Sequence, residues 1–412
     1  MKGPIAYLTG QYPRATDTFI QREVSALRAL GHEVVTASVR ATEAAHHVGP
    51  EQKAEYAATF QVMNAAKNPL RLIGAHLDAL LRNPKGWFAA LTLAARTRPP
   101  GLKAGLWQLF YFLEAGVLAQ HLRAKGVVHL HNHFADSSCS VAMLTSRISG
   151  IPFSVTMHGP GIFFEPKHWR IDEKIAQAAF FACISHFCRS QGMLFSDPKH
   201  WEKLKIVHCG VSPEMYGQDP DRGYKKRLLF IGRLDEVKGV PLLLKSFGEL
   251  IKTHPEAELH IVGDGPARAL LEGQAKGLGE AVRFLGYRSQ QEVAEILKET
   301  DMLILPSFAE GVPVVLMEAM AARLPVVTTQ VGGIGELVED SVSGFICPPG
   351  DLVTLTARID TLLSDAALCA KMGAEGQAKV AAEFNSPHEA RWLSQIIEGS
   401  LKGQLPKTLR PE

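Results

Sequence analysis

Short apolar runs alternate with helix-like segments along nearly the whole chain, and this alternation is the feature that most constrains its fold. Runs such as 302–305 are continuously apolar, as expected of parallel strands that are buried on both faces. Parallel strands need long crossovers, usually helices, so the pattern predicts an α/β fold with helices covering parallel sheets. The expected strands are 5–8, 34–37, 127–130, 153–156 and 180–184 in the first half, and 228–231, 259–262, 282–285, 302–305, 325–328 and 345–346 in the second.

The length of the chain predicts more than one domain. With 412 residues it is too long for one ordinary core, so we expect two doubly wound, Rossmann-like domains that face each other across a cleft. A polar stretch rich in turn residues, 210–223, is the expected linker. The predicted boundaries are 1–210, with a helical basic insertion at about 45–125, then 211–385, then 386–412 for a C-terminal helix and a frayed tail.

Composition excludes several classes of protein. The chain is 46% hydrophobic and 21% charged, which is typical of a globular protein, and its net charge of +2 argues against a nucleic-acid partner. No apolar run reaches the roughly 20 residues that span a bilayer, and the first residues lead directly into a strand, so we expect a cytoplasmic location. The six cysteines form no Cys-x-x-Cys pair, which favours buried structural thiols over a metal site.

Two glutamates, Glu310 and Glu318, follow the apolar run 302–305. Gly311 permits a turn and Pro313 suits the first position of a helix, where a missing N–H costs nothing. Glu310 then precedes this helix and Glu318 lies about one and a half turns into it, so both can face the crevice at the carboxyl end of the strand. The alternative is a turn carboxylate near a helix dipole and a solvated helix residue.

Two glycine turns follow earlier strands of the second half. The turn 232–239 holds Arg233 and Lys238 between glycines, where a guanidinium and an ammonium could bind a diphosphate. A solvated basic loop is the alternative. The turn at 262–266, Val-Gly-Asp-Gly-Pro, repeats the plan, but Arg268 occupies the place of the third glycine of a dinucleotide fingerprint, which disfavours a dehydrogenase.

These motifs together resemble a known family. Gly-Arg-Leu-x4-Gly at 232–239, Val-Gly-Asp-Gly-Pro at 262–266, Phe-Leu-Gly at 284–286, the Glu-x7-Glu pair at 310–318 and Val-Gly-Gly-x-x-Glu at 331–336 stand in the order seen in retaining glycosyltransferases of family 4. The stretches 12–20, 31–34, 131–135 and 156–159 are similar to the exopolysaccharide, colanic-acid-type branch. The resemblance implies the GT-B fold, with an acceptor-side first domain and a second domain that binds the nucleotide sugar.

The resemblance also implies the roles of individual residues. Arg233 and Lys238 would bind the nucleotide diphosphate, Glu318 the ribose hydroxyls and Glu310 the donor sugar. His158 would face that sugar near the reacting carbon; its alternative is an ordinary core or turn histidine. The catalytic set is therefore His158, Arg233, Lys238 and Glu310, and the substrate-binding set is Gly232, Gly263, Asp264, Phe284, Leu285, Gly311, Val312, Pro313, Val314 and Glu318.

The implied reaction transfers a sugar from a UDP- or GDP-sugar to an acceptor hydroxyl with retention, in the synthesis of an exopolysaccharide or a lipid-linked oligosaccharide. No cofactor and no metal ion are implied, since the nucleotide sugar is a co-substrate. Because Glu318 is assigned to ribose, no second nucleophile is evident, and a front-face mechanism is favoured over double displacement. A sugar-nucleotide epimerase of the same fold and a non-catalytic sugar-binding subunit are the alternatives.

Three further features remain open at this level. His131 and His133 look like a metal pair, but no third ligand has a suitable spacing, so packing at a strand end is preferred. Arg323 stands where the family usually has a glycine, either to contact an acceptor phosphate or to cap the helix C-terminus. Thr9 to Pro13 replace the usual glycine-rich loop after the first strand, which leaves phosphate contacts from that side open.

The region 61–110 carries seven lysines and arginines against one acid, Asp78, interleaved with large apolar residues. Such a pattern predicts basic amphipathic helices on an anionic membrane surface, at the inner face of the membrane. The alternative is a helical insertion packed on the first domain with a solvated basic face.

Overall fold

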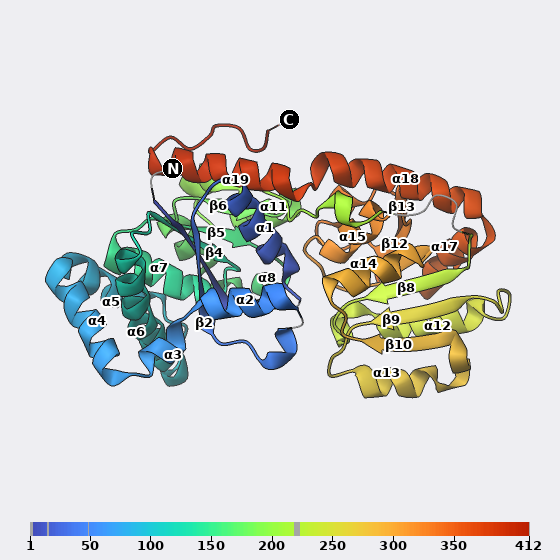
Figure 1. The fold of residues 1–412 in the computed structure, drawn as a ribbon, viewed down its shortest axis with the longest axis horizontal. Coiled ribbons are helices and arrows are strands. Elements are labelled where there is room, and N and C mark those ends of the chain that lie inside the picture. Colours follow the sequence, from blue (N-terminus) through green and yellow to red (C-terminus); the bar gives the residue numbers. More distant parts are fainter. Residues whose placement is uncertain (1–2, 15, 48, 218–222, 412) are drawn as a thin grey trace. The chain divides into compact units, whose positions relative to one another are not determined.

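The computed structural model of this chain describes residues 3–14, 16–47, 49–217 and 223–411, and it divides into two compact units (Figure 1). Unit 1 consists of residues 1–208 and 387–412, and unit 2 of residues 209–386. The stretch 218–222 of the expected linker lies outside the described residues.

Unit 1 is built on a parallel sheet of seven described strands in the order β3-β2-β1-β4-β5-β6-β7. Its strands are β1 Ile5–Gln11, β2 Val34–Arg40, β3 Phe60–Gln61, β4 His129–His133, β5 Phe153–Met157, β6 Phe181–Cys183 and β7 Leu204–Ile206. The helices are α1 Thr18–Ala29, α2 Pro50–Ala58, α3 Val62–Ala66, α4 Pro69–Arg82, α5 Pro84–Thr97, α6 Leu102–Ala124, α7 Ser137–Ser149, α8 Gly161–Phe164, α9 Pro166–Trp169, α10 Ile171–Gln177, α11 His186–Leu194 and α19 Ser386–Leu401.

Unit 2 is built on a parallel sheet of six described strands in the order β10-β9-β8-β11-β12-β13. Its strands are β8 Arg227–Ile231, β9 Glu258–Val262, β10 Val282–Gly286, β11 Met302–Leu305, β12 Val326–Thr329 and β13 Gly344–Cys347. The helices are α12 Val240–Leu250, α13 Arg268–Ala275, α14 Gln290–Lys298, α15 Val314–Ala321, α16 Ile334–Leu337, α17 Leu352–Ser364 and α18 Ala366–Glu383.

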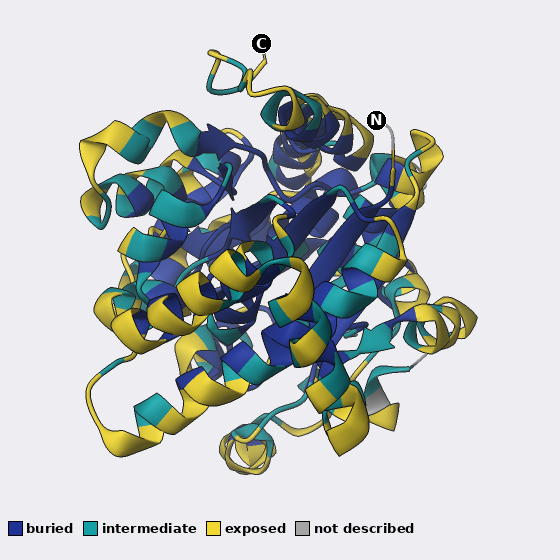
Figure 2. Ribbon diagram, turned by 90° about the vertical axis from the view of Figure 1, so that its left-hand side faces the viewer, coloured by how far each residue is buried: buried dark blue, intermediate teal, exposed yellow. Residues whose placement is uncertain are grey.

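All eleven strands expected from the apolar runs are present, and the α/β class with two Rossmann-like sheets is confirmed. Two strands were missed: β3 has only two residues and β7 only three, with Lys205 in its middle, so neither forms a continuous apolar run. All six cysteines are buried, and none forms a disulfide among the described residues. In Figure 2 the buried sheets are enclosed by helices whose outer turns are exposed.

The last helix belongs to unit 1, although it follows unit 2 in the sequence. Trp392, Leu393, Ile396 and Ile397 of α19 lie in one apolar cluster with residues of β1, α1 and β2. The tail does not fray as expected, because the Ile206 N–H donates to the Leu409 carbonyl (3.1 Å) and Arg410 forms an ion pair with Glu389 (2.5 Å).

The chain passes between the units twice, near residue 208 and near residue 386. The two passages lie beside each other in unit 2, where the Val211 N–H donates to the Phe384 carbonyl (2.9 Å) and the Ser386 N–H to the Val211 carbonyl (2.8 Å). Gly210 lies so close to Ser386 that a Cβ at Gly210 would meet the Ser386 backbone at 2.5 Å. The two passages are therefore joined as a short pair of extended segments.

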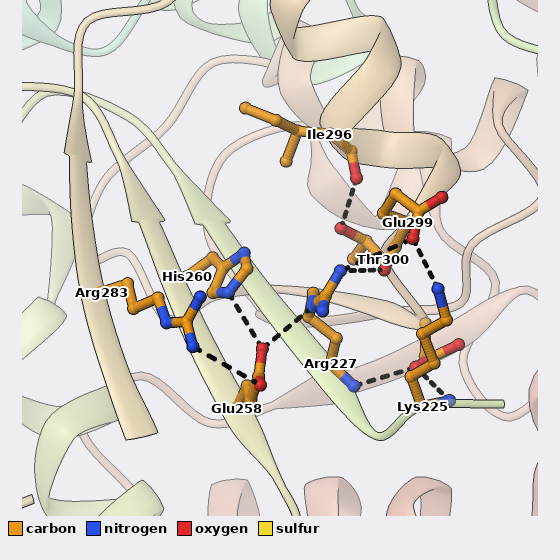
Figure 3. Close-up of polar contacts among 9 residues, drawn as sticks. Lys225, Arg227, Glu258, His260, Arg283, Ile296, Glu299 and Thr300 are labelled. Atoms are coloured by element: carbon orange, nitrogen blue, oxygen red, sulfur yellow. Dashed lines mark hydrogen bonds and ion pairs between the residues drawn. The ribbon is translucent and has the colours of Figure 1, made fainter. Parts of the chain in front are cut away.

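A network of ion pairs joins the amino ends of β8, β9 and β10 to the end of α14, where Arg227 also lies 3.7 Å from Glu299 (Figure 3). Glu258 contacts Arg227 (3.2 Å), Arg283 (3.8 Å) and His260 (3.2 Å), and Glu299 binds Lys225 (2.6 Å). Burial raises the pKa of Glu258, but the charges of Arg227 and Arg283 outweigh this effect and lower it below its ordinary value. This edge of the sheet thus balances its charges internally, whereas the opposite edge carries the glycine turns.

Candidate functional site

The carboxyl edge of the unit 2 sheet gathers the motifs of the second half. The strand order reverses between β8 and β11, which is where ligand crevices form in open parallel sheets. The turns that follow these two strands are in contact, because the Phe308 N–H donates to the Val237 carbonyl (2.8 Å). The switch point therefore brings together two segments about 70 residues apart in the sequence.

Close backbone packing explains the glycines of these turns. Gly263, with φ +128°, lies so near Gly232 that a Cβ would come within 1.9 Å of the Gly232 carbonyl oxygen. Gly332, with φ +56°, meets the Glu310 carbonyl in the same way, at 2.0 Å. Any side chain at either position would push the turns apart, so these glycines hold the edge of the sheet compact.

Lys238 and Glu310 form an ion pair at this switch point. The Lys238 ammonium donates to Glu310 Oε1 at 2.6 Å, and the Glu310 side chain is buried. Lys238 ends a short 3₁₀ turn after β8, and Glu310 lies in the turn after β11. The structure brings these two predicted residues together. The family resemblance had assigned Lys238 to the diphosphate and Glu310 to the donor sugar.

Glu318 is buried on α15 and accepts a hydrogen bond from the Tyr216 hydroxyl (3.0 Å). Its burial excludes the alternative of a solvated helix residue. Tyr216 was missed by the sequence analysis, because it lies in the stretch read as linker. The available signal was an aromatic residue within an otherwise polar segment, and Tyr216 is buried here.

The turn before α15 differs in detail from the prediction. Pro313 is the N-cap and not the first helical residue, since its ψ of 121° is extended. The Leu316 N–H donates to the Pro313 carbonyl (3.2 Å), whereas the amides of Val314 and Val315 have no acceptor among the described residues. Two outward donors thus remain, next to the buried Val312 and the turn residue Gly311.

The remaining predicted residues of unit 2 lie along the same edge. Arg233 is 61% exposed and only loosely paired, with its Nε 3.6 Å from Asp235. Asp264 accepts from the Gly265 N–H (2.7 Å) and from Arg268 (2.8 Å), so the arginine that replaces the third glycine of a dinucleotide fingerprint holds this carboxylate. Phe284 and Leu285 are half-buried on β10.

Arg323 follows α15 in the left-handed region, with φ +57°. This conformation explains why a glycine is usual at this position, because only glycine adopts it without strain. The Arg323 N–H donates to the Met320 carbonyl (3.0 Å), so the backbone and not the guanidinium ends the helix. The expected capping role of its side chain is therefore not observed.

His158 lies in unit 1, in a chain of buried hydrogen bonds at the point where the order of strands reverses between β1 and β4. His158 Nε2 is 3.1 Å from His133 Nδ1, and His133 Nε2 is 3.0 Å from Glu23 Oε1. The Tyr7 hydroxyl donates to the same Glu23 oxygen (2.5 Å). His158 is buried in this network, and its ring centroid lies 4.9 Å from that of Phe19, with the two rings tilted by 44°.

The network shifts the pKa of its members. Burial, followed by the charge of His133, lowers the pKa of His158 well below its ordinary value, and burial lowers that of His131 to about 3. Burial alone would raise the pKa of Glu23, but His133, His131 and the Tyr7 hydroxyl together lower it to about 2. His131 is therefore neutral and Glu23 ionised at neutral pH.

The sequence analysis found no third ligand with a suitable spacing for His131 and His133, but the structure places Glu23 beside both. One oxygen of Glu23 and one nitrogen of each histidine lie within 4.8 Å of one another, so these three could hold a metal ion. Each of these atoms already has a hydrogen-bond partner, as His131 Nε2 lies 2.8 Å from Thr156 Oγ1. Glu23 was missed because it is 110 positions from His133; the signal was a carboxylate within the buried stripe Ile20, Val24 and Leu27 of α1.

Comparison with known proteins decides the family. Residues 216–379 match the sequence profile of the family Glycosyl transferases group 1. The chain is 31% identical to alpha-D-kanosaminyltransferase of Streptomyces kanamyceticus over 287 residues. This alignment covers 63% of this chain and 73% of that protein. The chain belongs to this family.

Other group 1 relatives match over a shorter length. The amylovoran biosynthesis glycosyltransferase AmsK of Erwinia amylovora is 34% identical over 207 residues, which is 48% of this chain and 51% of AmsK. A glycogen synthase of Mycobacterium tuberculosis is 31% identical over 43% of its length. The chain thus spans about half the length of these two relatives.

Solved structures of the family's fold extend the likeness to the whole chain. Sucrose-phosphate synthase of Thermosynechococcus elongatus superposes with a TM-score of 0.76 at 18% identity, covering 98% of this chain and all of that one. Anabaena HepE, solved in complex with UDP, gives a TM-score of 0.71 at 16% identity over 96% of this chain. The fold is therefore GT-B, as the resemblance implied.

Among the described residues, no helix has the length and apolar character needed to cross a membrane.

Proposed function

We propose that this protein is a retaining glycosyltransferase that moves a sugar from a nucleotide sugar to an acceptor hydroxyl without a metal ion. The observation that carries the proposal is the Lys238–Glu310 pair at the switch point of unit 2, with the Tyr216–Glu318 pair also on that unit. A cation and two carboxylates on neighbouring turns suit the diphosphate, the sugar and the ribose of one donor molecule.

The charges fit the departure of a nucleoside diphosphate. Negative charge grows on the diphosphate as the bond to the sugar breaks, and the Lys238 ammonium and the exposed Arg233 guanidinium would stabilise it. Two side-chain cations can replace the divalent ion that other transferases use for this step. The two outward amides at the start of α15 would add donors beside the sugar.

The carboxylates suit a transferase that acts at the front face of the sugar. The double displacement of a retaining glycosidase needs two carboxyl groups at the reacting bond. Glu318 accepts a hydrogen bond from Tyr216 and is assigned to the ribose, so it is not available as the second group beside Glu310. Departure and attack on the same face, through an ion-pair-like state, require only that the diphosphate charge is stabilised. The role implied for His158 involves the other unit and stays a prediction.

A UDP-sugar is the donor to test first, because HepE was solved with UDP and with UDP-glucose; a GDP-sugar is the second choice. AmsK, named for amylovoran biosynthesis, supports an exopolysaccharide as the product. The acceptor would then be a saccharide, either free or carried by a lipid at the inner face of the membrane. A cytoplasmic location fits both, since nucleotide sugars are cytoplasmic substrates.

Two other functions are less favoured. An epimerase of the same fold would also bind a nucleotide sugar, but membership of the group 1 family supports transfer. A non-catalytic sugar-binding subunit would be expected to have lost site residues, whereas Arg233, Lys238, Glu310 and Glu318 are all present.

Thermal unfolding in the presence of UDP-, GDP-, ADP- and dTDP-sugars tests the proposal. A ligand that binds only the folded state stabilises it by about 2.7 kcal/mol at 100 times its Kd, so one nucleotide should raise the melting temperature clearly. Incubation of that donor with acceptor should then release the nucleoside diphosphate. A stabilising sugar that is epimerised without release of diphosphate would support the epimerase, and the absence of any shift would refute donor binding.

A further inference from the structure

The helices α4, α5 and α6 of unit 1 expose an unusual amount of apolar surface. Of the twenty-two large apolar side chains that are exposed among the described residues, eleven lie between residues 70 and 110. We call these eleven the apolar face: Leu70, Ile73, Leu77 and Leu81 on α4, Phe88 and Leu91 on α5, and Leu102, Leu106, Trp107, Leu109 and Phe110 on α6. The exposed fractions reach 82% for Leu70, 83% for Leu81 and 94% for Leu102.

The apolar face is not needed to hold these helices on unit 1. Their inner sides are already packed, with Ala75, Ala79 and Leu93 buried and with the Trp87 indole N–H donating to His76 (3.0 Å). His76 in turn lies 3.1 Å from the Leu113 carbonyl of α6. The alternative of an insertion that simply packs on the first domain therefore accounts for the inner sides only.

The exposed residues of α4 are spaced to form a single stripe. Leu70, Ile73, Leu77 and Leu81 recur at the three- and four-residue intervals that place side chains on one side of a helix. Figure 2, which faces the side of the molecule where α4 to α6 lie, shows exposed turns along these helices. A solvated helix normally has polar residues on its outer side. The outer side of α4 instead has the apolar stripe that is typical of a helix side buried against a partner.

Positive charge predominates on the segment that carries the apolar face, with seven lysines and arginines against one acid between residues 61 and 110. Asp78, the one acid between 61 and 110, is bound to Arg82 (2.6 Å), and Arg96 is bound to Glu173 (2.5 Å). Lys67, Lys85 and Lys103 have no acidic partner among the described residues. The whole chain has a net charge of only +2, so this excess of positive charge is local.

We propose that the apolar face docks on an anionic lipid bilayer, with α4 to α6 lying on the surface and no helix crossing it. Leucines, a tryptophan and phenylalanines would enter the boundary between headgroups and acyl chains, while the three lysines contact lipid phosphates. The positive charge favours a membrane over a protein partner. An anionic bilayer presents negative headgroups on every side of the apolar residues that enter it. The proposal does not depend on the chemistry of unit 2 and would stand if sugar transfer failed.

Co-sedimentation of the full chain with vesicles tests the proposal. We expect binding to vesicles of phosphatidylethanolamine and phosphatidylglycerol, weaker binding at raised salt, and little binding to phosphatidylcholine alone. Replacing the three lysines together (Lys67→Gln, Lys85→Gln, Lys103→Gln) should weaken binding about 100-fold, since each contributes roughly fivefold near an anionic surface. Binding that is equally strong to phosphatidylcholine would overturn the role of charge and with it the proposal.

A second variant tests the apolar contribution. Ile73→Ser, Leu77→Ser and Leu81→Ser together should weaken vesicle binding by at least about tenfold. The matched control replaces exposed apolar residues of unit 2, Leu270→Ser and Val353→Ser, and should bind as the unmodified chain does. Circular dichroism would verify that all variants are folded.

Two further results would overturn the proposal. One is that neither variant changes vesicle binding. The other is that the chain ignores vesicles but forms a dimer that the serine variant abolishes, which would assign the apolar face to a second copy of this chain.

Discussion

Lowering the pH from 7 to 5 should destabilise unit 1 strongly, because this unit buries histidines in their neutral form. Burial lowers the pKa of His129 and of His131 to about 3, and that of His158 well below the ordinary value of 6.5. A histidine whose pKa is depressed by folding takes up its proton first in the unfolded chain. Its contribution to stability is therefore complete above a pH of about 6.5 and is lost as the pH falls toward the folded pKa.

The expected loss can be worked out from these shifts. Between pH 7 and pH 5, His129 and His131 each cost about 2 kcal/mol, or about 4 kcal/mol together, and His158 acts in the same direction. Glu114 acts in the opposite direction: burial raises its pKa to about 7, so its folded carboxyl gains a proton and restores up to about 2 kcal/mol. The balance for these three groups is a loss of about 2 kcal/mol, to which His158 adds, and this is an appreciable part of the 5 to 15 kcal/mol that typically stabilises a domain.

Urea unfolding followed by tryptophan fluorescence reports this loss for unit 1 alone. The five tryptophans of the chain, Trp87, Trp107, Trp169, Trp201 and Trp392, all lie in unit 1. Unfolding curves at pH 7, 6 and 5 should give a steadily lower midpoint with an unchanged slope, since the native structure is the same and only the proton uptake differs.

A histidine variant isolates the cause. His129→Gln keeps a donor near Ser154, which lies 2.7 Å from His129 Nε2, but removes one titrating group. The difference in stability between pH 7 and pH 5 should shrink by about 2 kcal/mol. His388→Gln, at an exposed histidine of the same unit, is the matched control and should leave it unchanged. An identical pH dependence in His129→Gln and in the unmodified chain would refute the reasoning.

Three further predictions concern unit 2. Lys238→Ala should lower turnover of the identified donor about 100-fold or more, because a cation at the leaving diphosphate is lost, while folding stability falls far less; Lys245→Ala, at an exposed lysine, is the kinetic control. Tyr216→Phe should lower the free energy of unfolding by about 1–2 kcal/mol, since the buried Glu318 carboxylate loses a donor, and calorimetry would measure it. Arg323→Gly should raise the free energy of unfolding by about 1 kcal/mol in urea titrations, because it removes the left-handed strain. Arg323→Ala keeps a Cβ and should not stabilise; an equal gain in both variants would count against strain as the cause.

The strands could be predicted because their signal is local. Each of the eleven expected runs is apolar enough to mark a buried strand, and only the very short β3 and β7, each of which contains a polar residue and forms no continuous apolar run, were missed. The motifs at the ends of β8 and β11 were also local, and knowledge that parallel strands share one carboxyl edge was enough to place Lys238 and Glu310 at the same crevice.

Partners far apart in the sequence could not be predicted. Nothing near Glu23 indicates that it meets His133, and nothing near Tyr216 indicates Glu318, because such contacts arise only when α1 or the chain after residue 209 packs on its unit. The exposure of the apolar face was equally hidden. The composition of 61–110 fitted both a packed insertion and a surface helix, and only the packing of Ala75 and Ala79 inward, with Leu77 outward, separates them.

The position of α19 has a consequence for the order in which the protein can be made. The core of unit 1 includes Trp392, Leu393, Ile396 and Ile397, which the ribosome adds after the whole of unit 2. Unit 2 can thus complete its core during synthesis. Unit 1 is begun first, but part of its apolar core stays exposed until the last helix has been made. A chain that ends early, near residue 386, would therefore keep a finished unit 2 attached to an unfinished unit 1, which chaperones and proteases recognise.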